Sequence, residues 1–220
     1  MLDAVLFDLD GTLADTIPLI VASFNAAIGP VTGRSYSLAD VIARFGPPDT
    51  GMIRRELPDE AVWRDADEMY HAYYRKHHGK VVVFDGVPEM LAAVRATGLP
   101  VGLMTGKGRR SADITLAHLG WAVTFDAVVT GDEAEKPKPN PEPLIQVARM
   151  LGVDPRKCAY VGDSPADIKA GRAAGMKTIA AGWHAVYVEE VRALEPDYWG
   201  NHPRDVTDAV RRMMENGSRA

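Results

Sequence analysis

The chain carries near its N-terminus the stretch AVLFDLDGT, residues 4–12. Its first four residues form a continuous apolar run, which is typical of a strand buried on both faces, as in a parallel sheet. Asp8 and Asp10 follow where that strand should end, and open α/β sheets bind ligands at the carboxyl ends of their strands. Residues two apart in an extended chain point the same way, so both carboxylates can share one site. Two like charges that close need a cation or a shared proton, so the stretch predicts a functional site.

After residue 86 the sequence alternates between short apolar runs and longer segments with helical spacing. The expected strands span 99–105, 125–130, 157–161 and 177–181, and the expected helices span 87–97, 108–119, 139–151 and 165–174. We expect 177–181 to be the last parallel strand. The alternation predicts right-handed βαβ units, and therefore an α/β fold with a Rossmann-like, doubly wound parallel sheet.

A block of helices interrupts this alternation. Helices are expected at 17–28, ended by Gly29-Pro30, and at 37–45, 50–57 and 59–78, with no strand-like run before 81–84. We therefore expect an all-helical cap at residues 16–82, inserted into a core made of residues 1–15 and 83–220. Two further helices, expected at 186–194 and 205–214, carry no chemistry that the sequence identifies.

The composition is that of an ordinary globular protein, with 46% hydrophobic and 25% charged residues in a chain of 220. The net charge of -5 argues against nucleic acid as the main partner. A single cysteine, Cys158, excludes an intrachain disulfide and favours the reducing cytoplasm. There is no apolar run of about 18 residues, so we expect neither a membrane span nor a membrane partner. We expect a cytoplasmic monomer or weak dimer.

Polar residues follow four of the expected strands. They are Asp8 and Asp10 after the first, Thr105 after the second, Lys136 and Lys138 in the loop after the third, and Asp163 and Asp167 after the fourth. Carboxylates at two strand ends make a hard, all-oxygen site, which selects Mg²⁺ rather than zinc. A lysine and a hydroxyl nearby could hold the oxygens of a phosphoryl group.

Four segments of the chain also show a resemblance to a known family. They are DLDGTL at 8–13, Thr105, KPNPEP at 138–143 and VGDSPAD at 161–167. In this order they resemble the four motifs of the haloacid dehalogenase-like (HAD) superfamily, and the resemblance spans residues 4–175. The phosphoglycolate phosphatases and their inorganic pyrophosphatase relatives look most similar. The cues for that subgroup are Thr16, the loop FGPP at 45–48 and the KPNPEP motif.

The resemblance implies a role for each motif residue. Asp8 resembles the nucleophile that forms an aspartyl-phosphate, and Asp10 resembles the general acid and base. Asp8, the backbone carbonyl of Asp10, and Asp163 match the family's Mg²⁺ ligands, with Asp167 in a supporting position. The resemblance therefore implies Mg²⁺ as the cofactor.

Other positions match the groups that hold the substrate phosphate. Thr105 and Lys138 match the side chains that bind phosphoryl oxygens, and the amides of Leu9, Asp10 and Gly106 could add donors. An asparagine often follows the motif-two hydroxyl, whereas this chain has Gly106, so one side-chain donor is missing. Lys138 fits the register of the third motif, and Lys136 is the alternative.

The resemblance implies an Mg²⁺-dependent phosphohydrolase that acts on a small phosphorylated metabolite, with phosphoglycolate the first candidate and inorganic diphosphate the second. We expect the cap to exclude water and to select the substrate. Its candidate specificity residues are Arg44, Gly46, Pro47 and Arg54, and Trp183 and His184 could line the edge of the site.

Three other functions stay open at this point. One is a β-phosphoglucomutase-like sugar-phosphate mutase, although the mutases carry an arginine in the cap loop where this chain has GPPD at 46–49. Another is a 2-haloacid dehalogenase, which does not need the second aspartate or the metal. The third is a non-catalytic binding protein, and the complete set of motif residues argues against it.

Overall fold

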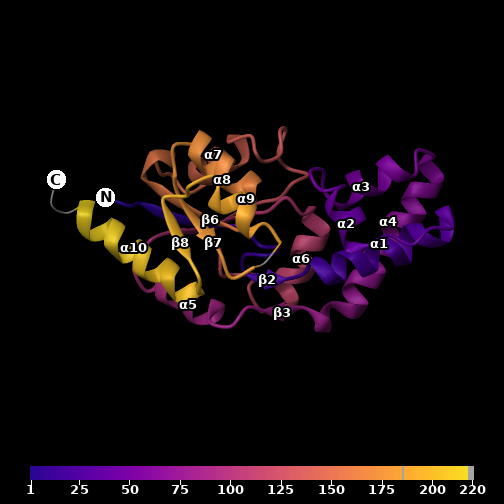
Figure 1. Ribbon diagram of the computed structural model, residues 1–220, viewed down its shortest axis with the longest axis horizontal. Coiled ribbons are helices and arrows are strands. Elements are labelled where there is room, and N and C mark those ends of the chain that lie inside the picture. Colours follow the sequence, from indigo (N-terminus) through magenta and orange to yellow (C-terminus); the bar gives the residue numbers. More distant parts are fainter. Residues whose placement is uncertain (185, 218–220) are drawn as a thin grey trace.

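The computed structural model describes residues 1–184 and 186–217 and is built around a six-stranded parallel sheet (Figure 1). In spatial order its strands are β5 (Ala127–Val129), β4 (Val101–Met104), β1 (Ala4–Phe7), β6 (Cys158–Gly162), β7 (Lys177–Ala181) and β8 (Tyr198–Gly200). Every neighbouring pair is parallel. The chain runs from β1 outward to β5 and then crosses to β6 on the other side of β1. This change of direction is the switch point at which α/β sheets bind ligands.

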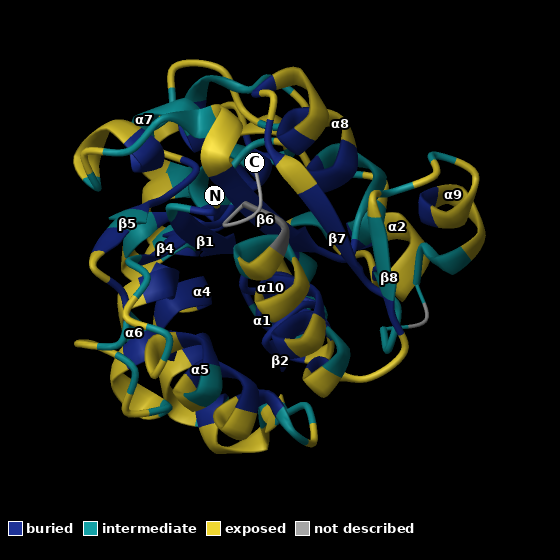
Figure 2. Ribbon diagram, turned by 90° about the vertical axis from the view of Figure 1, so that its left-hand side faces the viewer, coloured by how far each residue is buried: buried dark blue, intermediate teal, exposed yellow. Residues whose placement is uncertain are grey.

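Helices cover both faces of the sheet, as the expected βαβ units require. They are α5 (Val87–Arg95), α6 (Arg109–His118), α7 (Glu142–Met150), α8 (Pro165–Ala173), α9 (Val188–Arg192) and α10 (Pro203–Gly217), with a 3-10 turn η2 (Pro155–Lys157). Val5 and Phe7 of β1 pack with α5 and α10, whereas Ala4 and Leu6 pack with α7 and α8. Figure 2 shows the central strands in the dark blue of buried residues. The predicted Rossmann-like α/β core is confirmed.

The strand β7 is not the last parallel strand, so that expectation was wrong. Strand β8 pairs with it in parallel, and Ile179 lies opposite Tyr198. The segment PDYWGN at 196–201 contains no apolar run that would mark a strand in the sequence. The pairing with β7 and the packing of α10 hold this segment in the sheet, and neither is visible locally.

The inserted segment is helical throughout. It consists of α1 (Ile17–Thr32), α2 (Leu38–Ile42), α3 (Asp49–Glu56), α4 (Glu60–His77) and a 3-10 turn η1 (His78–Lys80). These helices enclose a hydrophobic cluster of their own, centred on Phe24, Tyr70 and Tyr74. At its base β2 (Ala14–Asp15) pairs antiparallel with β3 (Val82–Val83). Figure 1 shows α1–α4 gathered at the end of the molecule opposite α10.

We propose that α1–α4 form the cap and that β2 and β3 are its base, in line with the expected division at residues 16–82. The core expectation runs to residue 220, of which 218–220 lie outside the described residues. Helix α1 does not stop at Gly29-Pro30 as expected. It continues to Thr32, because a proline in the last turn removes a single backbone donor. Gly33, with φ of 65°, then ends the helix.

The cap helices contact the core mainly at the start of α6. The Gly108 amide donates to Asp49 of α3 at 3.0 Å, and Tyr70 of α4 donates to the other oxygen of that carboxylate at 2.7 Å. Further along, the Tyr74 hydroxyl lies 2.9 Å from the Thr115 hydroxyl in a buried contact. The loop before α6 therefore joins the sheet to two cap helices.

None of the helices in residues 1–184 and 186–217 combines the length and the apolar character that crossing a membrane needs. The cytoplasmic location and the monomeric or weakly dimeric state stay predictions.

A substitution at Gly102 of β4 tests how closely α7 packs against the sheet. A Cβ at this position would lie 2.5 Å from Val147 Cγ1 of α7 and 3.1 Å from Leu6 Cγ. Gly102→Ala should therefore lower the free energy of unfolding by about 1–3 kcal/mol, measured by urea denaturation. Gly79→Ala is the matched control, because nothing lies within 4 Å of that added methyl group. Equal stability of the two variants would contradict this view of the interface.

Candidate active site

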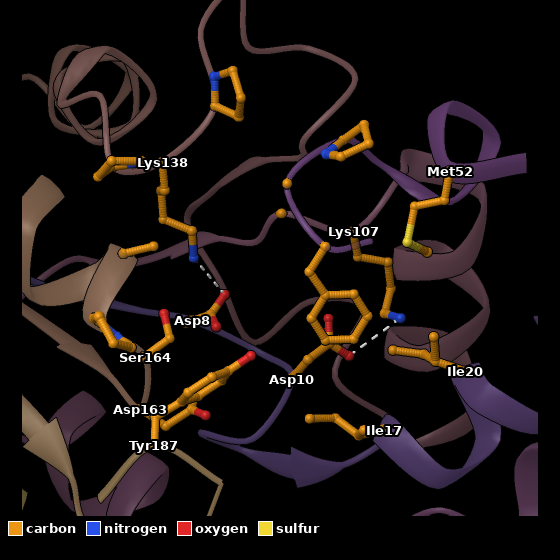
Figure 3. A pocket seen from close by; sticks show the side chains of 18 of the residues that line it. Asp8, Asp10, Ile17, Ile20, Met52, Lys107, Lys138, Asp163, Ser164 and Tyr187 are labelled. Carbon is orange, nitrogen blue, oxygen red and sulfur yellow. Dashed lines mark ion pairs between the residues drawn. The ribbon is translucent and has the colours of Figure 1, made fainter. Parts of the chain in front are cut away.

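The carboxyl ends of β1, β4 and β6 open onto a cavity of about 540 Å³. Asp8 and Asp10 follow β1, and Asp163 follows β6; all three line the cavity together with Lys138 from the loop before α7 (Figure 3). The parallel sheet brings these ends to one edge, so residues more than 150 positions apart meet there. The cap covers the opposite side of the cavity with Ile17, Ile20, Phe45, Pro47 and Met52.

Lys138 is the charge that links the carboxylates of β1 and α8. Its ammonium lies 3.0 Å from Asp8 Oδ1 and 2.6 Å from Asp167 Oδ1, and it donates to the Tyr160 hydroxyl at 3.0 Å. Burial alone would lower the pKa of Lys138, but the two carboxylates hold that pKa above its ordinary value. Lys136 is exposed and does not line the cavity, so of the two lysines the structure brings Lys138 to the site.

Asp8, Asp163 and Asp167 form a buried acidic cluster, with one oxygen from each within 4.8 Å of the others. Burial raises the pKa of Asp8 well above its ordinary value, and it also raises the pKa of Asp163. For Asp167 burial acts in the same direction, but Lys138 and the hydrogen bonds from Ser164 hold its pKa low. The cluster thus holds more negative charge than one lysine neutralises.

Asp167 differs from the other two carboxylates because both of its oxygens already have hydrogen-bond donors. Oδ1 accepts from Lys138 and from the Tyr160 hydroxyl, at 2.6 and 2.9 Å. Oδ2 accepts from the backbone and the side chain of Ser164, which caps α8. Gly162 is required beside it, because a Cβ there would lie 2.4 Å from Asp167 Cβ. This arrangement suits a supporting carboxylate, as the resemblance implied.

Asp163 is held from the β1 loop and from the segment after β7. Thr12 donates to its Oδ1 at 3.0 Å, and His184 Nδ1 lies 3.1 Å from its Oδ2. Gly11, with φ of 79°, allows the β1 loop to lie against Asp163, since a Cβ there would lie 2.3 Å from the Asp163 carboxylate. The Trp183 indole donates to the Thr12 carbonyl at 3.1 Å. Trp183 and His184 therefore do not line the cavity. They hold the β1 loop and the Asp163 carboxylate in place by hydrogen bonds.

Asp10 has three polar neighbours, and one of them was missed in the sequence. Thr16 donates to its Oδ1, and Thr105 donates to its Oδ2 at 3.4 Å. Lys107 Nζ lies 3.2 Å from Oδ1, with a side chain that is only 1% exposed. Burial alone would lower the pKa of Lys107, but Asp10, Tyr74 and Asp49 hold it above its ordinary value. The signal that could have found Lys107 is its position two residues after Thr105.

The structure places the expected phosphate-binding groups at different depths. Gly106 lines the cavity, whereas Thr105 is fully buried beneath it and accepts a hydrogen bond from the Lys107 amide at 3.2 Å. The Leu9 side chain packs in the core. Gly131 is required beside Gly106, because a Cβ there would lie 2.2 Å from the Gly106 carbonyl oxygen.

Of the expected cap specificity residues, Gly46 and Pro47 line the cavity and the two arginines do not. Arg44 pairs with Glu56 at 2.7 Å within the cap. The Arg54 guanidinium lies over the Trp63 ring, 5.1 Å from its centre. In this structure both arginines lie outside the lining of the cavity and contact other cap residues.

The family comparison agrees with this geometry. The sequence profile described as "Haloacid dehalogenase-like hydrolase" matches residues 5–181 of this chain. The chain belongs to the haloacid dehalogenase-like hydrolase family. It is thus an enzyme of a hydrolase family, and the resemblance drawn from the four motifs is confirmed.

Its relatives in this hydrolase family include named phosphatases. The chain is 36% identical over 199 residues to the pyrophosphatase PpaX of Bacillus velezensis, covering 89% of this chain and 90% of that protein. It is 33% identical over 235 residues to the N-acetylmuramic acid 6-phosphate phosphatase of Pseudomonas aeruginosa, covering 97% and 96%. A predicted phosphoglycolate phosphatase from Haemophilus somnus 129pt has the same fold, with a TM-score of 0.84, 23% identity and coverage of 95% and 98%. The two relatives above 30% identity are named as phosphatases of different substrates, and the solved structure shows the shared fold.

The residues of this hydrolase fit a hard divalent cation. Asp8 and Asp163 offer carboxylate oxygens, the donor type that Mg²⁺ prefers. Asp8 Oδ1 is buried without a hydrogen bond of normal geometry from any described residue. Lys138, 3.0 Å away, balances only one negative charge of the cluster of Asp8, Asp163 and Asp167, so a divalent cation would compensate the remainder.

The acidic cluster makes a prediction about metal binding that does not depend on turnover. Asp163→Asn should weaken Mg²⁺ binding by about tenfold or more, measured by isothermal titration calorimetry, because the amide removes a negative charge from the cluster. Asp208→Asn, an exposed carboxylate on α10, is the matched control and should bind Mg²⁺ as the unchanged protein does. Equal affinity of Asp163→Asn and the control would contradict this assignment.

Proposed function

We propose that this hydrolase is a Mg²⁺-dependent phosphatase that removes phosphate from a small metabolite through an aspartyl-phosphate on Asp8. The observation that carries the proposal is the buried set of Asp8, Lys138 and Asp163 beside Asp10 on one cavity. Asp8, Asp163 and the backbone carbonyl of Asp10 would hold the cation. Bound there, it would supply positive charge to the oxygens of the transferring phosphoryl group.

The first half of the reaction would use Asp8 and Asp10 in different roles. An oxygen of Asp8 attacks phosphorus, the bond from phosphorus to the leaving oxygen breaks, and Asp10 gives that oxygen its proton. Lys138 lies 3.0 Å from Asp8 Oδ1, where it can attract an oxygen of the phosphoryl group. The other phosphoryl oxygens are proposed to accept hydrogen bonds from the amides of Leu9 and Gly106. The Thr105 hydroxyl is proposed to bind a phosphoryl oxygen or to hold the loops that line the cavity.

The second half releases the phosphate. Asp10 takes a proton from a water molecule, the water oxygen attacks phosphorus, and the bond between phosphorus and Asp8 breaks. Inorganic phosphate leaves and Asp8 is again a free carboxylate. Two groups hold Asp10 from different elements, Thr16 at the base of the cap and Thr105 after β4, so that its carboxylate stays beside the cavity.

Phosphoglycolate remains the first candidate substrate and inorganic diphosphate the second. Diphosphate is supported by the relative named pyrophosphatase PpaX, at 36% identity. The absence of an arginine from the described lining of the cavity argues against a sugar-phosphate mutase, whose cap loop carries one. The acidic cluster and Asp10 together argue against a dehalogenase or a non-catalytic protein.

Asp8→Asn tests the nucleophile. It should lower phosphate release by about 10³-fold or more on every substrate of a panel that contains phosphoglycolate, diphosphate, sugar phosphates and nucleotides, because covalent attack needs the carboxylate. Asp208→Asn should keep full activity, and circular dichroism should show both variants folded. Substantial turnover by Asp8→Asn, or full activity of the unchanged protein in excess EDTA, would overturn the mechanism.

The two lysines before α7 give a matched pair of variants. Lys138→Met should lower kcat by about 10²-fold or more, since it removes the cation closest to the attacking oxygen. Lys136→Met should leave kcat within about twofold, because Lys136 is exposed and lies outside the cavity lining. The reverse pattern in phosphate-release assays would make Lys136 the motif-three lysine instead.

A further inference from the structure

Lys107 is the buried cation that the proposed mechanism does not use. Its side chain is 1% exposed, and it lines the cavity from the loop between β4 and α6. Its ammonium lies 3.2 Å from Asp10 Oδ1 and 4.8 Å from the centre of the Tyr74 ring. Within the described part of the chain, the ammonium makes no hydrogen bond of normal geometry. The ammonium therefore has N–H donors that no described residue uses, although a buried ammonium needs acceptors to replace its lost water.

The acceptors already near Lys107 are committed elsewhere. One oxygen of the Asp49 carboxylate accepts a hydrogen bond from the Tyr70 hydroxyl at 2.7 Å, and the other accepts one from the Gly108 amide at 3.0 Å. The nearby Thr105 hydroxyl accepts the amide of Lys107 itself rather than the ammonium. The remaining open direction is the cavity, which Lys107 and Asp10 line together (Figure 3).

The position of Lys107 places it on the leaving-group side of the reaction. In-line transfer puts the leaving oxygen opposite the attacking oxygen. Figure 3 shows the Lys138 ammonium directed at Asp8 and the Lys107 ammonium directed at Asp10, with the two lysines on different sides of the cavity. Since Asp10 is the proposed donor to the leaving oxygen, Lys107 lies beside the first atoms of the leaving group.

We propose that Lys107 is a specificity-determining residue that binds an anionic oxygen of the leaving group, carried one or two atoms from the scissile oxygen. A carboxylate, as in phosphoglycolate, and a phosphate, as in diphosphate, share this chemistry. The inference rests on the proposed phosphatase function and deepens it. Lys107 takes the role expected for Arg44 and Arg54, which have partners on the cap.

The test compares three substrates that differ beyond the scissile oxygen: phosphoglycolate, diphosphate and ethyl phosphate, in which a methyl group replaces the carboxylate. The unchanged protein should show a kcat/KM at least about tenfold higher for one of the two anionic substrates than for ethyl phosphate. The anionic substrate with the higher kcat/KM shows whether the group that Lys107 binds is a carboxylate or a phosphate. Lys107→Met should lower that preference about 10- to 100-fold, whatever happens to the absolute rates. Lys136→Met, an exposed lysine outside the cavity, should keep the preference.

Two results would overturn the inference while the proposed function stands. One is an unchanged protein that hydrolyses ethyl phosphate as well as both anionic substrates, a result that needs no variant to fold. The other is a Lys107→Met protein that loses activity equally on all substrates, because Lys107 would then only position Asp10. Hydrolysis of none of the three, nor of any ester in the panel, would overturn the proposed function together with this inference.

Discussion

The site depends on the buried contact of Lys138 with Asp8 and Asp167, at 3.0 and 2.6 Å. Three carboxylates meet at the ends of β1 and β6, and without a cation their mutual repulsion and their lost hydration would oppose folding. Lys138 offsets part of that charge, and Asp167 fixes its ammonium in place. The charge left on Asp8 and Asp163 is what makes the cluster suited to a divalent cation.

A second ion pair, between the buried Lys107 and the partly exposed Asp10, lies where the core meets the cap. The loop that carries Lys107 also donates to Asp49 through Gly108, while the Tyr74 ring of α4 faces the ammonium. The cap therefore contacts the loop before α6, and through Lys107 of that loop it is linked to Asp10, the proposed acid–base residue. Under the proposed roles of Lys107 and Asp10, substrate specificity and proton transfer would both depend on this contact.

The environment of the cavity changes from one side to the other. Charged groups from the strand ends form its floor, and Ile17, Ile20, Phe45 and Met52 from the cap form its apolar wall. Such a wall excludes water and strengthens the electrostatic attraction between the lysines and an anionic substrate. This arrangement suits a small phosphorylated molecule enclosed between cap and core.

The sequence by itself determined the α/β core, the helical insertion and the polar residues at the strand ends. These follow from local patterns: the apolar run before Asp8, the helical spacing and the motif order. Only the tertiary structure decided the rest. It showed the additional strand β8, the continuation of α1 past Pro30, the pairing of Arg44 within the cap and the contact of Lys107 with Asp10. It also placed Lys138, which the motif register favoured over Lys136, beside Asp8. The physical reason is that β8, Lys107 and Arg44 depend on partners elsewhere in the chain, and local spacing carries no information about which of those residues supplies the pairing. The end of α1 is local, but the sequence pattern did not show that the helix tolerates Pro30 in its last turn.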